Sequence, residues 1–186
     1  MKIPNFFNPK NAGTYNYDPD QRKLLLESVD FKKTNSIGAA STDRMKTILL
    51  LIDMQRDFCF PEGSLYVAGR SGTGAIDDSV RIAEFIYQNM GSISQITTTL
   101  DTHFSGQIFS PFFWVQGDGS FPDPHTVISA DEIRNGTYKP NPAIVEAAVG
   151  NSGAYSWLMK QVIYYCEELE KKGKYMLYLW PEHCLL

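Results

Sequence analysis

The chain has 186 residues, of which 43% are hydrophobic and 13% aromatic, a composition that allows one folded domain and excludes a disordered chain. A net charge of -4 and a pI near 5.4 give no basic surface for nucleic acid, so a small molecule is the expected partner. No secretory signal is visible, nor any apolar run of the roughly 18 residues that a membrane helix needs. The widely spaced Cys59, Cys166 and Cys184 suggest no disulfide framework, so we expect a cytoplasmic protein without a membrane partner.

Residues 1 to 44 differ in character from the rest of the chain. They are polar apart from a leucine patch at residues 24 to 26, and Pro4, Pro9 and Pro19 interrupt them early. We interpret this stretch as an N-terminal arm that packs on the domain without carrying chemistry. The domain itself is predicted to occupy residues 45 to 186.

A β-α-β unit is predicted after the arm. Residues 47 to 52 are nearly all apolar, as in a strand covered on both faces, and the run ends at Asp53. Apolar residues then recur at helical spacing from 76 to 90, where Gly91 ends the helix. A second buried strand over 95 to 100 completes the unit, which should cross over right-handedly into a parallel sheet.

Asp101 and His103 follow the second predicted strand directly. Side chains two residues apart in a strand point to the same side, and a carboxylate with a neutral imidazole suits Zn, Fe or Mn. Ligands of an open parallel sheet bind outside the carboxyl ends of its strands, so Asp53 should face the same edge. The alternatives are a surface aspartate with a turn-capping histidine, and an Asp53 that only caps its own loop.

The remaining stretch is predicted to hold a long connection, a helix and a third strand. Residues 104 to 151 are irregular and rich in proline and aromatic residues, which favours a functional cover with a short helix near 130 to 135. An apolar stripe from 155 to 169 predicts a helix with Cys166 in the core. A third strand over 175 to 179 then runs into a polar cluster.

Three motifs stand at the three strand ends: Asp53-Met54-Gln55-Arg56-Asp57-Phe58-Cys59, Asp101-Thr102-His103 and Trp180-Pro181-Glu182-His183-Cys184. In this order, across residues 48 to 184, they resemble the motifs of the nicotinamidase and isochorismatase-like cysteine hydrolase superfamily, nearest its nicotinamidase-type amidases. The resemblance implies a three-layer α/β/α fold with a mostly parallel, Rossmann-like sheet. It also implies hydrolysis of a small carboxamide, nicotinamide or a related amide, as in NAD metabolism.

The resemblance also implies a role for individual residues. Asp53 resembles the aspartate of the family's Asp-Lys-Cys triad, which takes the proton of the nucleophilic thiol. Phe58 and Trp180 match the positions that flank the substrate ring. A divalent metal ion, with zinc preferred, would have three protein ligands: Asp101, His103 and His183. We further expect a homo-oligomer.

The chain also departs from the family pattern. The family's lysine and nucleophilic cysteine follow its Trp-Pro-x-His motif, and neither has a match within residues 1 to 186, so we expect the chain to be the N-terminal portion of the full domain. Gln107 stands where nicotinamidases often carry another histidine. The insert at 104 to 151 is longer than in compact nicotinamidases, which leaves open an isochorismatase-like hydrolase of another substrate. A non-catalytic binding module of the same fold is the further alternative.

Two residue assignments have competitors. His125 is an alternative third ligand, but no predicted strand aims it, so we prefer His183. Cys59 and Cys184 are alternative nucleophiles. We interpret both as packing residues, because a reactive thiol needs an electropositive setting that nearby Asp and Glu residues oppose.

Overall fold

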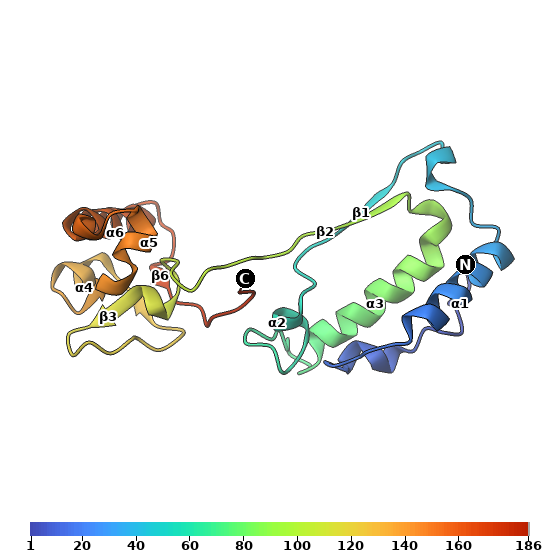
Figure 1. Ribbon diagram of the computed structural model, residues 1–186, viewed down its shortest axis with the longest axis horizontal. Coiled ribbons are helices and arrows are strands. Elements are labelled where there is room, and N and C mark those ends of the chain that lie inside the picture. The colour runs from blue at the N-terminus through green and yellow to red at the C-terminus, as the bar shows by residue number, and fades with distance from the viewer. Residues whose placement is uncertain (186) are drawn as a thin grey trace. The chain divides into compact units, whose positions relative to one another are not determined.

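The computed structural model describes residues 1 to 185, and the chain divides into two compact units, Met1–Asp101 and a second that begins at Thr102 (Figure 1). The protein is mixed α/β, and within the described part its strands form three two-stranded sheets. None of the described helices has the length and apolar character needed to span a membrane. Short 3-10 turns lie at Pro9–Gly13, Ala40–Thr42, Met90–Ser92, Pro111–Phe113, Pro142–Ile144 and Ser152–Ala154.

The first unit contains the predicted β-α-β unit. Strands β1 (Ile48–Leu51) and β2 (Gln95–Thr98) pair in parallel, and helix α3 (Gly74–Asn89) connects them along the chain. The helix ends in a 3-10 turn that contains Gly91, in agreement with the sequence pattern. The prediction of a strand, a helix and a parallel strand is therefore confirmed.

The strands of this sheet are less buried than the sequence predicts. Ile48 and Leu50 of β1 are 61% and 52% exposed, and Ile96 of β2 is 44% exposed. Leu49 and Leu51 of β1 are half-buried, because successive side chains of a strand point to opposite faces. The prediction that both strands are buried is wrong for this unit, whose described residues leave one face of β1 open.

The N-terminal 44 residues contain a helix that the sequence analysis did not predict. Helix α1 (Gln21–Thr34) begins after Asp20, whose side chain caps its N-terminus by accepting the backbone N–H of Lys23 at 3.0 Å. Phe31 of α1 and Phe6 pack edge-on against a tyrosine of α3, Tyr87. This part of the chain thus packs on α3 through aromatic contacts. The predicted division into residues 1 to 44 and 45 to 186 stays a prediction.

One short helix interrupts the loop that follows β1. Helix α2 (Arg56–Cys59) lies within the first motif, and its backbone is held by an N–H···O bond from Cys59 to the carbonyl of Gln55 at 2.9 Å. The motif is therefore partly helical and not an open loop.

The second unit is built largely from the stretch predicted to be irregular. Strands β3 (Trp114–Gln116) and β5 (Tyr138–Pro140) pair antiparallel. Helix α4 (Ala130–Arg134) confirms the predicted short helix, and helix α5 (Val145–Val149) follows. Ser129 caps α4 in a reciprocal capping box with Glu132. This stretch is thus a folded part of the unit.

Helix α6 (Tyr155–Lys171) confirms the predicted amphipathic helix and supplies one side of the core. Cys166 is fully buried, as predicted, and burial raises the pKa of its thiol to about 12. The core of this unit consists of Phe113, Trp114, Ile128, Ala130, Ile133, Ile144, Val145, Leu158, Val162, Cys166, Leu177 and Leu179. Most of these residues come from the insert, so the insert provides much of its own packing.

The third predicted strand exists, but its pairing differs from the prediction. Strand β6 (Leu177–Tyr178) pairs antiparallel with β4 (Val127–Ile128) in a sheet of its own. It does not extend the β1–β2 sheet within residues 1 to 185, so the described chain is mixed α/β without a three-layer core. Further along, Leu185 forms an isolated parallel bridge with His103.

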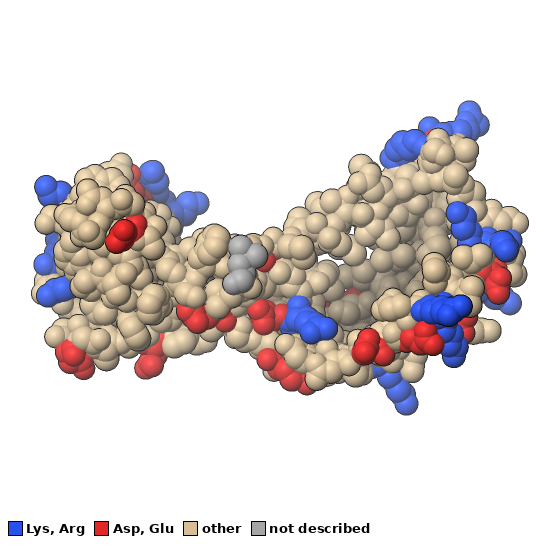
Figure 2. Space-filling view, viewed as in Figure 1, with Lys and Arg blue, Asp and Glu red and all other residues tan. Residues whose placement is uncertain are grey.

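Charged side chains of both signs are scattered over the drawn face of each unit (Figure 2). Arg134, for example, forms ion pairs with Asp131 and Glu167 on the surface of the second unit. These pairs are exposed and add little to stability. The drawn face shows no broad field of positive charge.

Candidate metal centre

The end of β1 is tied to the end of β2 through Asp53. The backbone N–H of Asp53 donates to the hydroxyl of Thr99 at 3.1 Å, and that hydroxyl donates to Oδ1 of Asp53 at 3.0 Å. Asp53 has φ 56, in the left-handed region that aspartate tolerates better than most residues. The carboxylate is thus held at the strand end, where the sequence predicts the general base.

The side chain of Gln55 binds the backbone of Asp101, just beyond the end of β2. Its side-chain amide donates to the backbone carbonyl of Asp101 at 2.9 Å and accepts from the backbone N–H of Asp101 at 2.5 Å. The amide thereby forms the pair of bonds that a neighbouring strand would form. Gln55 was not predicted as a site residue, although its place in the first motif was a signal. Its contacts make it the residue that fixes the backbone of Asp101.

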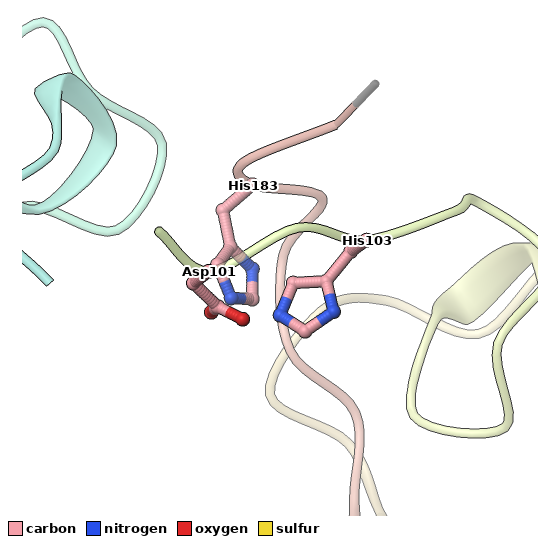
Figure 3. Close-up of side chains that lie close together, drawn as sticks. All are labelled: Asp101, His103 and His183. Atoms are coloured by element: carbon pink, nitrogen blue, oxygen red, sulfur yellow. The ribbon is translucent and has the colours of Figure 1, made fainter. Parts of the chain in front are cut away.

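Asp101, His103 and His183 form the one cluster of potential metal ligands found among the described residues (Figure 3). Each offers one ligand atom, and these atoms lie within 4.8 Å of one another. The rings of His103 and His183 lie with their centroids 4.8 Å apart at an interplanar angle of 69°. His183 is buried, and the other two side chains are half-buried.

Backbone pairing brings the two histidine motifs together. The N–H of His103 donates to the carbonyl of Cys184 at 3.0 Å, beside the bridge between His103 and Leu185. Asp101 needs no such contact, because only one residue separates it from His103 in the chain. Sequence spacing predicted the Asp-x-His half of the cluster, and the pairing supplies His183.

The hydrogen bonds of the imidazoles determine which ring nitrogens face a ligand. Nδ1 of His183 lies 2.7 Å from the carbonyl oxygen of Pro181, and Nδ1 of His103 lies 3.0 Å from Oε1 of Gln107. A carbonyl oxygen only accepts, so Nδ1 of His183 carries a hydrogen, and Nε2 is the ring nitrogen that would bind a metal ion. Metal-binding histidines in proteins commonly have this second contact.

His125, the alternative third ligand, lies outside the cluster. Its side chain is exposed, and its Nδ1 lies 2.6 Å from the hydroxyl of Tyr178. The backbone of His125 has φ 71 and donates its N–H to the carbonyl of Leu179 at 2.6 Å. The geometry therefore favours His183 over His125.

The cysteines near the motifs differ in their surroundings. Cys59 of α2 is buried, which raises the pKa of its thiol; a hydrogen bond with Ser79 lowers it, and the charge of Asp78 raises it further. Cys184 is half-buried, has φ 48, and supplies the carbonyl that pairs with His103. A raised pKa disfavours the thiolate, so the setting of Cys59 is that of a packing residue.

The two predicted ring-binding residues lie in different units. Phe58 is half-buried in α2 of the first unit. Trp180 of the second unit is 43% exposed, packs edge-on against Tyr178 at 4.7 Å, and donates its backbone N–H to Phe109 at 2.9 Å. That they flank one substrate ring stays a prediction.

Comparison of the chain with family models, with curated proteins and with solved structures found no match. The family resemblance therefore rests on the three motifs alone. The case for a metal site rests on the positions of Asp101, His103 and His183.

Proposed function

We propose that Asp101, His103 and His183 bind a divalent metal ion, zinc by preference, in a metal-dependent cysteine hydrolase of small carboxamides. One observation carries the proposal: a carboxylate and two imidazoles offer ligand atoms within 4.8 Å of one another. Catalytic zinc and non-haem iron sites use such sets of three protein ligands and keep positions open for water or substrate. Zinc bonds of about 2.0 to 2.2 Å require donors closer than this, so binding would draw the side chains together.

The proposed reaction converts nicotinamide, or a related amide, into the acid and ammonia. A thiol gives its proton to Asp53 and attacks the amide carbon. The C–N bond breaks as the leaving amino group takes that proton from Asp53 and departs as ammonia. Water then cleaves the thioester, which releases the acid and restores the thiol. The bound metal would polarise the substrate and hold water. Asp53 is suited to its role because Thr99 holds its carboxylate at the strand end. The proposal assigns neither the lysine nor the nucleophilic thiol to a residue among 1 to 186.

The proposal includes the three-layer fold of the resembling family. In that fold the β1–β2 sheet would gain further strands and a second covering layer. The exposure of Ile48, Leu50 and Ile96 supports this, because apolar strand residues of this kind are normally covered on both faces of a parallel sheet.

A binding module with the same metal centre is the second candidate. The raised pKa values of the Cys59 and Cys166 thiols favour it, since neither group is set up as a nucleophile. Such a module would bind a metal and a small amide without cleaving it.

Metal binding is tested by titrating the metal-free chain with zinc and measuring the zinc retained after desalting. We expect one equivalent in the wild type, none in His183→Ala and one in the control His125→Ala. Zinc retained by His183→Ala and lost from His125→Ala would overturn the assignment.

Catalysis is tested by following ammonia release from nicotinamide and a panel of small carboxamides with zinc supplied. We expect no turnover by residues 1 to 186, because they supply the base without an activated thiol and a triad that lacks its nucleophile keeps only residual activity. Turnover at the rate of an ordinary amidase would return Cys59 or Cys184 to the role of nucleophile. Binding of an amide to the zinc-loaded chain, measured by calorimetry, is expected under both candidates.

A further inference from the structure

Gln107 makes two contacts through a single atom. Its Oε1 lies 3.0 Å from Nδ1 of His103 and accepts the backbone N–H of Phe104, also at 3.0 Å. Its own backbone is fixed in a turn, since its N–H donates to the carbonyl of Phe104 at 3.1 Å and its carbonyl accepts from Ser110 at 2.8 Å. The side chain is therefore presented to the imidazole by an ordered loop.

The contact with Phe104 settles which end of the amide faces His103. A backbone N–H only donates, so the atom that it meets must be the amide oxygen and not the nitrogen. That same oxygen meets Nδ1 of His103, which must then carry a hydrogen. The neutral ring consequently keeps its lone pair on Nε2.

A second contact restrains the plane of the ring. Phe109 packs edge-on against His103, with centroids 4.9 Å apart and an interplanar angle of 76°. The imidazole is thus fixed by a polar contact at one nitrogen and by an aromatic ring. Both partners, Gln107 and Phe109, belong to the insert at 104 to 151.

We propose that Gln107 is a positioning residue that holds His103 in the Nδ1–H tautomer, so that Nε2 is the ring nitrogen that would bind the metal ion. The proposal rests on the metal centre proposed above and gives the insert a direct part in it. His183 has the same arrangement through the Pro181 carbonyl, a backbone group that side-chain substitution does not remove. The hydrogen bond to Nδ1 of His103, in contrast, comes from a side chain, so a substitution of Gln107 can remove it.

The first test is zinc affinity, measured by competition with a chelator. Gln107→Ala should bind zinc about 10- to 100-fold more weakly than the wild type, the usual effect of losing such a partner. Gln107→Glu keeps an acceptor for both hydrogens and should recover most of the affinity. The control is Gln116→Ala. Gln116 is the last residue of β3, and its side-chain amide donates to the hydroxyl of Ser120, so its loss should leave zinc affinity unchanged.

The second test needs no metal and so separates this proposal from the metal centre. Nitrogen-15 NMR of the metal-free chain, at mildly alkaline pH, reports which ring nitrogen of His103 bears the hydrogen. We expect Nδ1–H in the wild type and in Gln107→Glu, and Nε2–H, the form that imidazole prefers in water, in Gln107→Ala. A wild type that fails to bind zinc would contradict the metal centre, whereas Nδ1–H retained in Gln107→Ala would overturn the role of Gln107.

Discussion

The two units of the protein bury their apolar residues to very different extents. In the first unit, Pro4 and Cys59 are the buried residues, although β1 is a continuous apolar run. In the second unit, Trp114, Ile128 and Leu179 are completely buried. An apolar strand thus indicates that its side chains need to be buried. Whether they are buried depends on the helices and strands that pack against them.

The second unit obtains its cover locally. The insert at 104 to 151 contributes aromatic and aliphatic residues to a core shared with α6. The β3–β5 sheet lies within the insert, and the β4–β6 sheet joins the insert to the end of the chain. The first unit has the short helix α2 and one long helix, α3, between its two parallel strands, and parallel sheets normally need layers on both faces. The second unit therefore contains most of the buried apolar residues, and the predicted base, Asp53, lies in the first unit.

The largest expected effect is on the core of the second unit. Trp114→Ala should lower the free energy of unfolding by about 3 to 5 kcal/mol, because it leaves a cavity and removes the bond from the indole N–H to the carbonyl of Ile108 at 2.7 Å. Denaturant titration followed by circular dichroism measures this. Trp157→Ala is the matched control, since Trp157 is 54% exposed and should change the value by no more than about 0.5 kcal/mol. Equal losses of stability in the two variants would contradict the assignment of Trp114 to the core.

Asp53→Asn should act on chemistry and not on stability. Under the proposed hydrolase activity it should lower kcat by about 100-fold or more, the scale for loss of a general base, while zinc content stays unchanged. The amide oxygen still accepts the Thr99 hydroxyl, so the strand ends should keep their connection. An unchanged kcat would remove Asp53 from the mechanism.

Alkaline pH should weaken the second unit through Cys166. Burial raises the pKa of this thiol from 9.0 to about 12 in the folded state. The neutral thiol therefore favours the fold fully below pH 9, and this contribution is lost as the pH rises toward about 12. Urea titrations from pH 8 to 11 should show the decline, and Cys166→Ala should be less stable at pH 8 but decline less. An identical decline in the variant would assign the effect to other groups.

The smallest effect is expected on the open face of the first unit. Leu50→Thr should change the free energy of unfolding by no more than about 0.5 kcal/mol, because Leu50 is 52% exposed and threonine suits a strand. The same urea titration measures it. A loss of 2 kcal/mol or more, typical of a buried leucine, would show that this face is covered in solution.

Local periodicity predicted the parts of the fold that local interactions determine. Helices α3 and α6 and the strands β1 and β2 follow from apolar spacing, and so does the buried position of Cys166. Helix α1 was missed because its leucines are largely exposed and its stripe is weak. The pairing of β6 was missed because a two-residue strand takes its partner from tertiary contacts.

The candidate site divides in a similar way. Strand-end position and motif resemblance predicted all three clustered side chains. Gln55 and Gln107, which hold two of them, were missed as supports. Their roles depend on loop backbone geometry, which residue type and spacing do not encode.

The pairing of His103 with Cys184 and Leu185 has a topological consequence. The chain enters the second unit and returns from its core at the same place, so the two ends of this segment are neighbours. A folded segment with adjacent ends can be inserted into a surface loop of another domain without separating that loop's flanks. The two ends of the second unit thus lie side by side, and His103 and His183 lie at these ends.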